Sequence, residues 1–244
     1  MTLLGGILQR AFESGRVPAN AARLVRKAKA PKRTEVRPLA PSQIEKMRAA
    51  VAPRDAALLS VLAYAGLRPG EALALRWGDV RDRTLLVQHA VSLGAEKGTK
   101  TGHNRTVRLL GPLAEDVVEW KVRSGDPVDS ELLFPGRRNA PWTLPAYNSW
   151  RRRSFRRAAA AAGVAGARPY DLRHSFASLL LHEGRSVIYL ARQLGHGAQL
   201  TLETYGHVID ELADRPQQDA EEVILAARSN GAAPELPIGP LSVS

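Results

Sequence analysis

The chain has 244 residues and is strongly basic, with 35 lysines and arginines against 24 acidic residues and a formal net charge of +11. Its hydrophobic fraction of 44% is typical of a globular protein with a packed core, and the excess positive charge favours a polyanionic partner such as nucleic acid. The absence of cysteine excludes disulfides, thiolate metal sites and a cysteine nucleophile.

Membrane and secretory segments are not indicated by the sequence. No apolar run approaches the ~18 residues that a membrane-spanning helix needs. The first residues lack the basic region and small-residue cleavage site of a secretory signal. We therefore expect a cytoplasmic protein without a membrane partner.

The first 37 residues do not have the pattern of a complete domain. Apolar residues at helical spacing predict an amphipathic helix over 3–14, and a further short helical stretch over 20–28. The segment 26–37 is rich in lysine and arginine around Pro31, which is typical of an extended basic linker. A segment of ~37 residues cannot bury a useful core alone.

The middle of the chain alternates helical and extended patterns. A helix start is predicted at Pro41–Glu45, with Ser42 as its cap. An Ala- and Leu-rich stretch predicts a buried helix over 54–66, and Pro69 suits the first turn of a helix that runs to Leu75. Alternating residues around turn-forming glycines then predict strands over 84–94 and 104–110, which would pair as a small antiparallel sheet.

The remainder is predicted to be helical up to a terminal tail. The predicted helices are 112–123, 146–162, 171–183, 187–195, 198–204 and 208–228. The last residues contain several prolines and glycines, which is typical of a flexible tail.

One predicted helix, 146–162, carries a run of positive charge. Its arginines are Arg151, Arg152, Arg153, Arg156 and Arg157. At about 100° per residue they cover more than half of the helix circumference. A solvated face is the usual explanation of such a run. The other interpretation is a DNA-binding helix that contacts phosphates, with Trp150 and Phe155 interleaved.

The stretch from Tyr170 to Tyr205 concentrates side chains that can act on a phosphate. It contains Arg173, His174 and His196 between the two tyrosines. A tyrosine can be a nucleophile, and arginine and histidine can stabilise a phosphate under attack. A packing role is the common alternative for either tyrosine. This stretch alone does not show which of the two tyrosines would be the nucleophile.

Two earlier residues complete a candidate phosphate site. Arg68 lies at a tight turn between an apolar helix and a proline-glycine helix start, where its guanidinium can clamp two phosphate oxygens. Lys100 lies in a predicted hairpin, from which a lysine can protonate a leaving oxygen. Each residue also has an ordinary interpretation. Arg68 would be a surface arginine at a helix start, and Lys100 an exposed lysine of a hairpin.

Taken in order, these motifs resemble those of the tyrosine recombinase (phage integrase) family over residues 38–210. The motifs are Gly66-Leu67-Arg68-Pro69-Gly70-Glu71, Lys100-Thr101 followed by Arg105-Thr106-Val107, Asp171-Leu172-Arg173-His174, Leu194-Gly195-His196, and Tyr205. The resemblance implies an α+β fold that is mainly α, a helical catalytic domain with a small antiparallel β-sheet of about three strands.

The resemblance also implies a DNA strand transferase that needs neither metal nor cofactor. Tyr205 would attack a backbone phosphate to give a 3′-phosphotyrosyl link and a free 5′-hydroxyl, and the partner strand's 5′-hydroxyl would reverse the step. Arg68 and Arg173 would hold the two non-bridging oxygens. Lys100 would be the general acid for the 5′-oxygen, and His196 would donate a hydrogen bond to the phosphate.

The remaining site positions support the chemistry or depart from the family. Glu71 and His174 are implied to be supporting residues. The family usually has histidine, less often lysine, where this chain has Tyr170. A tyrosine hydroxyl can hydrogen-bond a phosphate oxygen, but with an ordinary pKa of about 10 it is a poor base and carries no positive charge. We therefore predict reduced or altered activity rather than its loss.

Domain and partner expectations follow from the same resemblance. We expect a remnant of a core-binding domain with its basic linker over 1–37, a catalytic domain over 38–228 and a flexible tail over 229–244. With most of the core-binding domain absent, DNA affinity would be weak. The implied partners are double-stranded DNA and other copies of the chain, as a tetramer on DNA and a monomer when free, at the nucleoid.

Two other functions stay open from the sequence. One is a topoisomerase IB-like enzyme that relaxes DNA with the same chemistry, and the other is a non-catalytic DNA-binding remnant. The predicted helix 208–228 also has two interpretations: it docks into a neighbouring protomer, as in the family, or it packs on its own domain.

Overall fold

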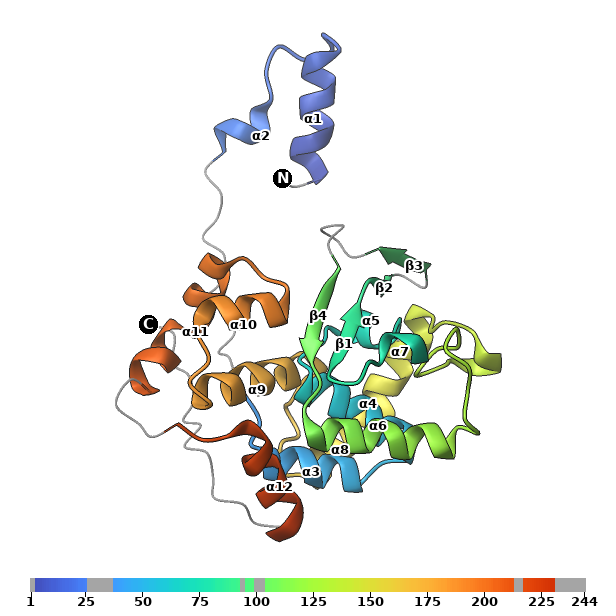
Figure 1. The fold of residues 1–244 in the computed structure, drawn as a ribbon. Helices are drawn as coiled ribbons and strands as arrows, with labels where there is room; N and C mark the ends of the chain where they lie inside the picture. Colours follow the sequence, from blue (N-terminus) through green and yellow to red (C-terminus); the bar gives the residue numbers. More distant parts are fainter. Residues whose placement is uncertain (1–2, 26–36, 93–94, 99–103, 213–216, 231–244) are drawn as a thin grey trace. The chain divides into compact units, whose positions relative to one another are not determined.

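The computed structural model describes residues 3–25, 37–92, 95–98, 104–212 and 217–230 (Figure 1). Lys100 and the predicted tail lie outside these residues. The chain divides into two compact units, residues 1–34 and residues 35–242, which are described separately below. Within the described residues, no helix combines the length and the apolar character needed to cross a membrane.

The first unit is a pair of helices, α1 (Leu3–Glu13) and α2 (Ala21–Leu24), joined through Asn20. The Asn20 side-chain amide donates to the Gly5 carbonyl and to the Gln9 side chain, both at 3.1 Å. Its oxygen caps the first turn of α2. One buried asparagine therefore closes the turn between the two helices.

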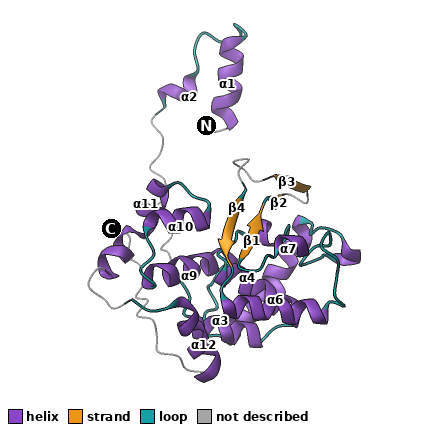
Figure 2. Cartoon of the chain, viewed as in Figure 1, coloured by secondary structure: helices purple, strands orange, loops and turns teal. Residues whose placement is uncertain are grey.

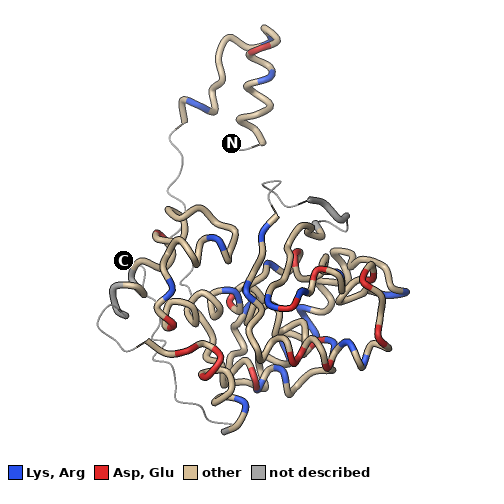
Figure 3. The backbone as a smooth tube through the Cα atoms, viewed as in Figure 1, with Lys and Arg blue, Asp and Glu red and all other residues tan. Residues whose placement is uncertain are grey.

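The second unit is mainly helical (Figures 1 and 2), as predicted. Its helices are α3 (Pro41–Ala49), α4 (Pro53–Tyr64), α5 (Pro69–Ala72), α6 (Gly111–Arg123), α7 (Leu144–Trp150), α8 (Arg156–Ala161), α9 (Pro169–His182), α10 (Val187–Leu194), α11 (Ala198–Leu212) and α12 (Ala220–Asn230). Its strands are β1 (Thr84–Val87), β2 (His89–Ser92), β3 (Ala95–Gly98) and β4 (Arg105–Arg108). Basic and acidic positions are interspersed along these elements (Figure 3).

Helices α4 and α9 form the centre of the second unit. Both are buried along nearly their whole length. Helix α4 is rich in alanine and leucine, whereas α9 also buries polar side chains, among them Asp171, Arg173 and His174. Helix α4 packs against α9, α3 and α6. The motif residues of α9 are therefore held by the core itself.

The strands form two antiparallel pairs rather than one sheet of about three strands. Strand β1 pairs with β4, with Leu85 opposite Val107, and β2 pairs with β3. The predicted strand 84–94 is divided at Gln88, whose side chain donates to the Asp79 carboxylate at 2.8 Å. Leu85 and Val107 are buried, so the β1–β4 pair is the one that contributes to the core.

Several predicted helix boundaries were wrong. Helix α3 begins at Pro41, so the N-cap is Ala40 and not Ser42, and the Gln43 side chain accepts a hydrogen bond from the Ala40 backbone N–H. Helix α5 ends at Ala72, before the predicted Leu75. The predicted helices 198–204 and 208–228 are instead α11 and α12. Helix α11 continues through Tyr205 because Tyr205 and Val208 share one buried face.

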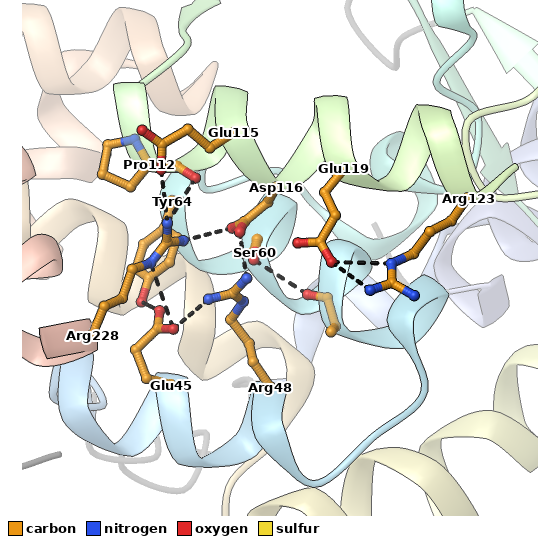
Figure 4. A network of polar contacts seen from close by, with 11 residues as sticks. Glu45, Arg48, Ser60, Tyr64, Pro112, Glu115, Asp116, Glu119, Arg123 and Arg228 are labelled. Atoms are coloured by element: carbon orange, nitrogen blue, oxygen red, sulfur yellow. Dashed lines mark hydrogen bonds and ion pairs between the residues drawn. The ribbon is translucent and has the colours of Figure 1, made fainter. Parts of the chain in front are cut away.

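Helix α12 packs on its own domain through a network of charged residues (Figure 4). The Arg228 guanidinium donates to the Asp116 carboxylate at 2.7 Å and lies 3.6 Å from Glu45. Arg48 bonds the same two carboxylates. Ile224, on the inner face of α12, is fully buried. In this structure α12 is thus attached to α3 and α6 by both charge and apolar packing.

We expect Arg228→Met to lower the free energy of unfolding by about 1–3 kcal/mol, because the largely buried Asp116 loses a charged hydrogen-bond partner. Urea denaturation measures the change. Arg123→Met is the matched control, since it removes an ion pair with Glu119 in which both side chains are more than half exposed, and such pairs contribute at most about 1 kcal/mol. Equal losses in the two variants would contradict a specific role of Arg228.

Candidate active site

The turn after α4 is shaped by Gly66. Its φ of +61° lies in the left-handed region, and a Cβ at this position would meet Phe176 of α9 at 2.3 Å, so only glycine fits. The Gly66 carbonyl accepts a hydrogen bond of 2.5 Å from Arg173 Nη1. The turn that leads to Arg68 is therefore fastened directly to α9.

Arg68 begins α5 and is oriented by Glu71. The Arg68 backbone N–H donates to Glu71 Oε2 at 2.9 Å, and its Nη1 donates to Glu71 Oε1 at 2.8 Å. Its Nη2 lies 3.4 Å from the Gly195 carbonyl. With 38% of its side chain exposed, Arg68 presents a positive charge to solvent from a fixed base.

Glu71 is also held by Arg105, at the start of β4. Arg105 Nη1 and Nη2 donate to the two carboxylate oxygens of Glu71 at 3.0 and 2.7 Å, and its Nε donates to the Gln193 carbonyl at 3.0 Å. Burial alone would raise the pKa of Glu71, but the hydrogen bonds and charge of Arg105, with those of Arg68, lower it to about 2. Glu71 is therefore ionised at neutral pH.

Arg173 is wholly buried in α9 and contacts His196. Its Nη2 donates to the Leu194 carbonyl and lies 2.9 Å from His196 Nε2. Burial and the charge of Arg68 lower the pKa of Arg173 to about 10, so it is still charged at neutral pH. Because arginine only donates, His196 Nε2 is the acceptor and a neutral ring carries its proton on Nδ1.

The charge state of His196 follows from its surroundings. Burial and the nearby charges of Arg173 and Arg68 lower its pKa to about 3. The imidazole is therefore neutral across the physiological range. The Nδ1 of His196 is buried and makes no hydrogen bond among the described residues, so a ligand reaches this donor only if the turn moves.

Tyr205 is connected to the same helix through His174. Only 2% of Tyr205 is exposed, and its hydroxyl lies 2.6 Å from His174 Nδ1. The ring of Tyr170 lies edge-on to His174 with their centroids 5.2 Å apart, and 39% of Tyr170 is exposed. Consecutive residues of α9, Arg173 and His174, thus contact the candidate phosphate ligands and the candidate nucleophile.

The structure brings most of the predicted site residues into one connected set. These are Arg68, Glu71, Tyr170, Arg173, His174, His196 and Tyr205. Lys100 lies outside the described residues. Arg105 belongs to one of the sequence motifs, but nothing in the sequence predicted its contact with Glu71, 34 positions earlier. No cluster able to hold a metal occurs among the described residues.

The arginine-rich segment agrees with a solvated face but not with interleaved aromatic rings. Its five arginines are exposed, on a π-helical turn (Arg151–Phe155) and the start of α8. Trp150 and Phe155 are buried and pack against each other, with centroids 5.7 Å apart. The expected interleaving of aromatic rings for nucleic acid was therefore wrong, because these rings belong to the core. Phosphate contact by the arginines stays a prediction.

Comparison with known proteins agrees with this site. The model of the phage integrase family matches residues 37–211, and the chain therefore belongs to the phage integrase family. The prophage integrase IntR of Escherichia coli K12 is 27% identical over 237 residues, covering 88% of this chain and 57% of the relative. Tyrosine recombinase XerD of Yersinia pestis is 33% identical over 168 residues, covering 65% and 51%. The chain thus spans about half the length of these relatives.

Solved structures share the fold. The XerA recombinase matches with a TM-score of 0.59 at 24% identity, covering 77% of this chain and 68% of that one. The Tn1549 transposon integrase in complex with transposon right-end DNA matches with a TM-score of 0.63 at 19% identity, covering 86% and 76%. The predicted fold class is confirmed. Each of the four proteins is named as a recombinase or an integrase, which favours neither the topoisomerase nor the non-catalytic alternative.

We expect His196 not to titrate between pH 5 and 8 in the folded protein, because its pKa of about 3 lies far below the ordinary value of about 6.5. Histidine ring NMR shifts, assigned with His196→Gln, measure this, and the urea-unfolded chain is the control. Since the unfolded chain binds the proton more readily, this residue destabilises the fold as pH falls below about 6.5. A folded-state midpoint for His196 near 6.5 would contradict the assignment.

Proposed function

We propose that this chain is a site-specific DNA recombinase that cleaves and rejoins DNA strands through a 3′-phosphotyrosyl intermediate on Tyr205. One observation carries the proposal. Arg68, Arg173 and His196 are held around two adjacent backbone segments, and Tyr205 is hydrogen-bonded to the residue after Arg173. This gathers positively charged and neutral donors beside a tyrosine hydroxyl.

In the proposed reaction, the Tyr205 oxygen forms a bond to phosphorus while the bond to the 5′-oxygen breaks. His174 Nδ1, 2.6 Å from the hydroxyl, is within reach of the proton that Tyr205 loses. Lys100 gives a proton to the departing 5′-oxygen. The 5′-hydroxyl of another strand then attacks the phosphotyrosine and releases Tyr205. One phosphodiester replaces another, so no nucleotide cofactor is required.

The arginines stabilise the transition state more than the bound substrate. The pentacoordinate phosphorus gains negative charge on its non-bridging oxygens, and guanidiniums that reach these oxygens stabilise it. Arg68 is partly exposed, whereas Arg173 is buried and donates to the Gly66 and Leu194 carbonyls, so Arg173 has to exchange protein contacts for the phosphate. Arg68 and Arg173 supply these charges, and the neutral His196 donates from Nδ1 once movement of its turn exposes this buried atom. Removing either arginine would cost about 3 kcal/mol by analogy with the loss of one oxyanion donor.

Tyr205 must be uncovered before it can attack. Its side chain is only 2% exposed, whereas a nucleophile has to come within about 3 Å of the phosphorus it attacks. We therefore include a shift of α11 on DNA binding as part of the mechanism.

The partner in this proposal is double-stranded DNA, bound largely through its phosphates. The exposed arginines 151–153, 156 and 157 contact the backbone beyond the scissile phosphate, and Tyr170 hydrogen-bonds a phosphate oxygen. The active assembly is a homotetramer on DNA that dissociates to monomers when free. Such an enzyme works at the chromosome, and we place it at the nucleoid in the cytoplasm.

We expect Tyr205→Phe to abolish covalent protein–DNA complexes, because it removes the attacking oxygen. The complexes are trapped on a library of nicked duplexes and measured as DNA-linked protein on denaturing gels. Tyr189→Phe, at a half-buried tyrosine of α10, is the matched control and should trap like the parent. Trapping by Tyr205→Phe would refute the assignment. Once a site is selected from the library, two-site recombination against plasmid relaxation separates a recombinase from a topoisomerase.

We expect Tyr170→His to cleave faster than the parent by on the order of tenfold, because an imidazole can carry a positive charge or exchange a proton near the phosphate where a phenol does neither at neutral pH. Single-turnover cleavage of the nicked duplex measures the rate. Tyr170→Phe should be slower than the parent, since it lacks the hydroxyl. A slower Tyr170→His would count against a phosphate-contacting role for this position.

A further inference from the structure

We propose that Arg105 is a positioning residue that fixes the Arg68 turn and the His196 turn, the two halves of the site, relative to each other. The inference rests on the proposed function. Arg105 opens β4 opposite Val87 of β1, and 13% of its side chain is exposed. It lies within the folded sheet beside the site, not on the DNA-facing arginine segment.

All three of its nitrogen atoms are directed at the protein. The two terminal nitrogens meet the two oxygens of Glu71, and Nε donates to the Gln193 carbonyl. Arg68, by contrast, uses one terminal nitrogen on Glu71 and is 38% exposed. Arg105 therefore acts on other side chains, and Arg68 is the one available to a phosphate.

The contacts of Arg105 reach both halves of the site. Through Glu71 it fixes the backbone N–H and the guanidinium of Arg68. Through the Gln193 carbonyl it fixes the last turn of α10, three residues before His196. The guanidinium also lies against the turn itself, since a Cβ on Gly195 would be 3.0 Å from Arg105 Nη1. Without Arg105, the two turns would be joined through Arg173 and the longer contact of Arg68 with Gly195, and their relative position would be less fixed.

The geometry requires an arginine. A planar guanidinium can make two parallel bonds to a carboxylate and a third bond from Nε, whereas a lysine offers one ammonium group at the end of a flexible stem. The lowered pKa of Glu71, about 2, agrees with a strong paired contact. A lysine at 105 would keep the positive charge but could not bond Glu71 and the Gln193 carbonyl at the same time.

A matched arginine lies three residues further along the same strand. Arg108 donates to Glu183 at 2.6 Å and to Glu221 at 3.0 Å, with 25% of its side chain exposed. These contacts lead to α9 and α12 and not to Arg68 or His196. Arg108→Met therefore controls for the loss of a paired arginine from β4.

The test is single-turnover formation of the covalent complex by Arg105→Met, Arg105→Lys and Arg108→Met. We expect Arg105→Met to be slower by roughly 10- to 100-fold, the range seen when groups that orient reacting ligands are removed, with DNA binding within about twofold of the parent, since no phosphate contact is lost. Arg105→Lys should stay slow by about tenfold, and Arg108→Met should stay within about threefold. A parental rate for Arg105→Lys would overturn the proposal, as would an equal loss in Arg108→Met.

A double variant tests the route through Glu71. If Arg105 acts on Arg68 through this carboxylate, Arg105→Met should slow the Glu71→Gln variant by a smaller factor than it slows the parent. Equal factors in the two backgrounds would mean that Arg105 acts independently of Glu71, against the proposal.

A readout without DNA separates this inference from the proposed function. The ring NMR shifts of His196 should change in Arg105→Met and Arg105→Lys and stay parental in Arg108→Met. If the parent forms no covalent complex, the proposed function is wrong. The His196 NMR shifts still test whether Arg105 positions the His196 turn. Unchanged His196 shifts in folded Arg105→Lys would overturn it.

Discussion

The buried guanidinium of Arg173 is the constraint on which the site depends. A charge fully removed from water is costly unless hydrogen bonds replace its hydration. Here the carbonyls of Gly66 and Leu194 and the ring of His196 provide them. These acceptors come from two turns that are distant in sequence. Burying one arginine therefore requires the Arg68 turn and the His196 turn to converge on α9.

The convergence leaves the site with unbalanced positive charge. Among the described residues, Arg68 and Arg105 bond the carboxylate of Glu71 and Arg173 feels its charge, and Glu71 stays ionised because its pKa is lowered to about 2. The same positive surroundings, together with burial, keep His196 neutral. Two positive charges remain in excess, and a phosphate that gains charge during attack would offset them. The excess positive charge of the site would therefore be balanced best when a phosphate in its transition state is bound.

Local patterns in the sequence were sufficient for most of the helices, though not for all of their ends. The apolar stretch 54–66 predicted the buried α4, and the family resemblance of the motifs at Arg68, Arg173, His196 and Tyr205 implied that these side chains share one site. Contacts between distant residues were not predictable in this way. The bonds of Arg105 to Glu71 and Gln193 span 34 and 88 positions, and the burial of Trp150 and Phe155 depends on packing that a local charge pattern does not reveal.

The placement of Tyr205 separates the proposed nucleophile from the proposed phosphate ligands. Neighbouring residues on a helix point about 100° apart, so Arg173 and His174 face different partners although they are adjacent in α9. Arg173 is fixed in the core, whereas Tyr205 lies on α11, which packs on α9 and α10. In the proposed reaction, uncovering Tyr205 requires α11 to move. Helix α11 begins at Ala198, two residues after His196, and Arg173 contacts His196 and the Leu194 carbonyl. The movement that uncovers the proposed nucleophile can therefore also free the buried donors of Arg173 for a phosphate.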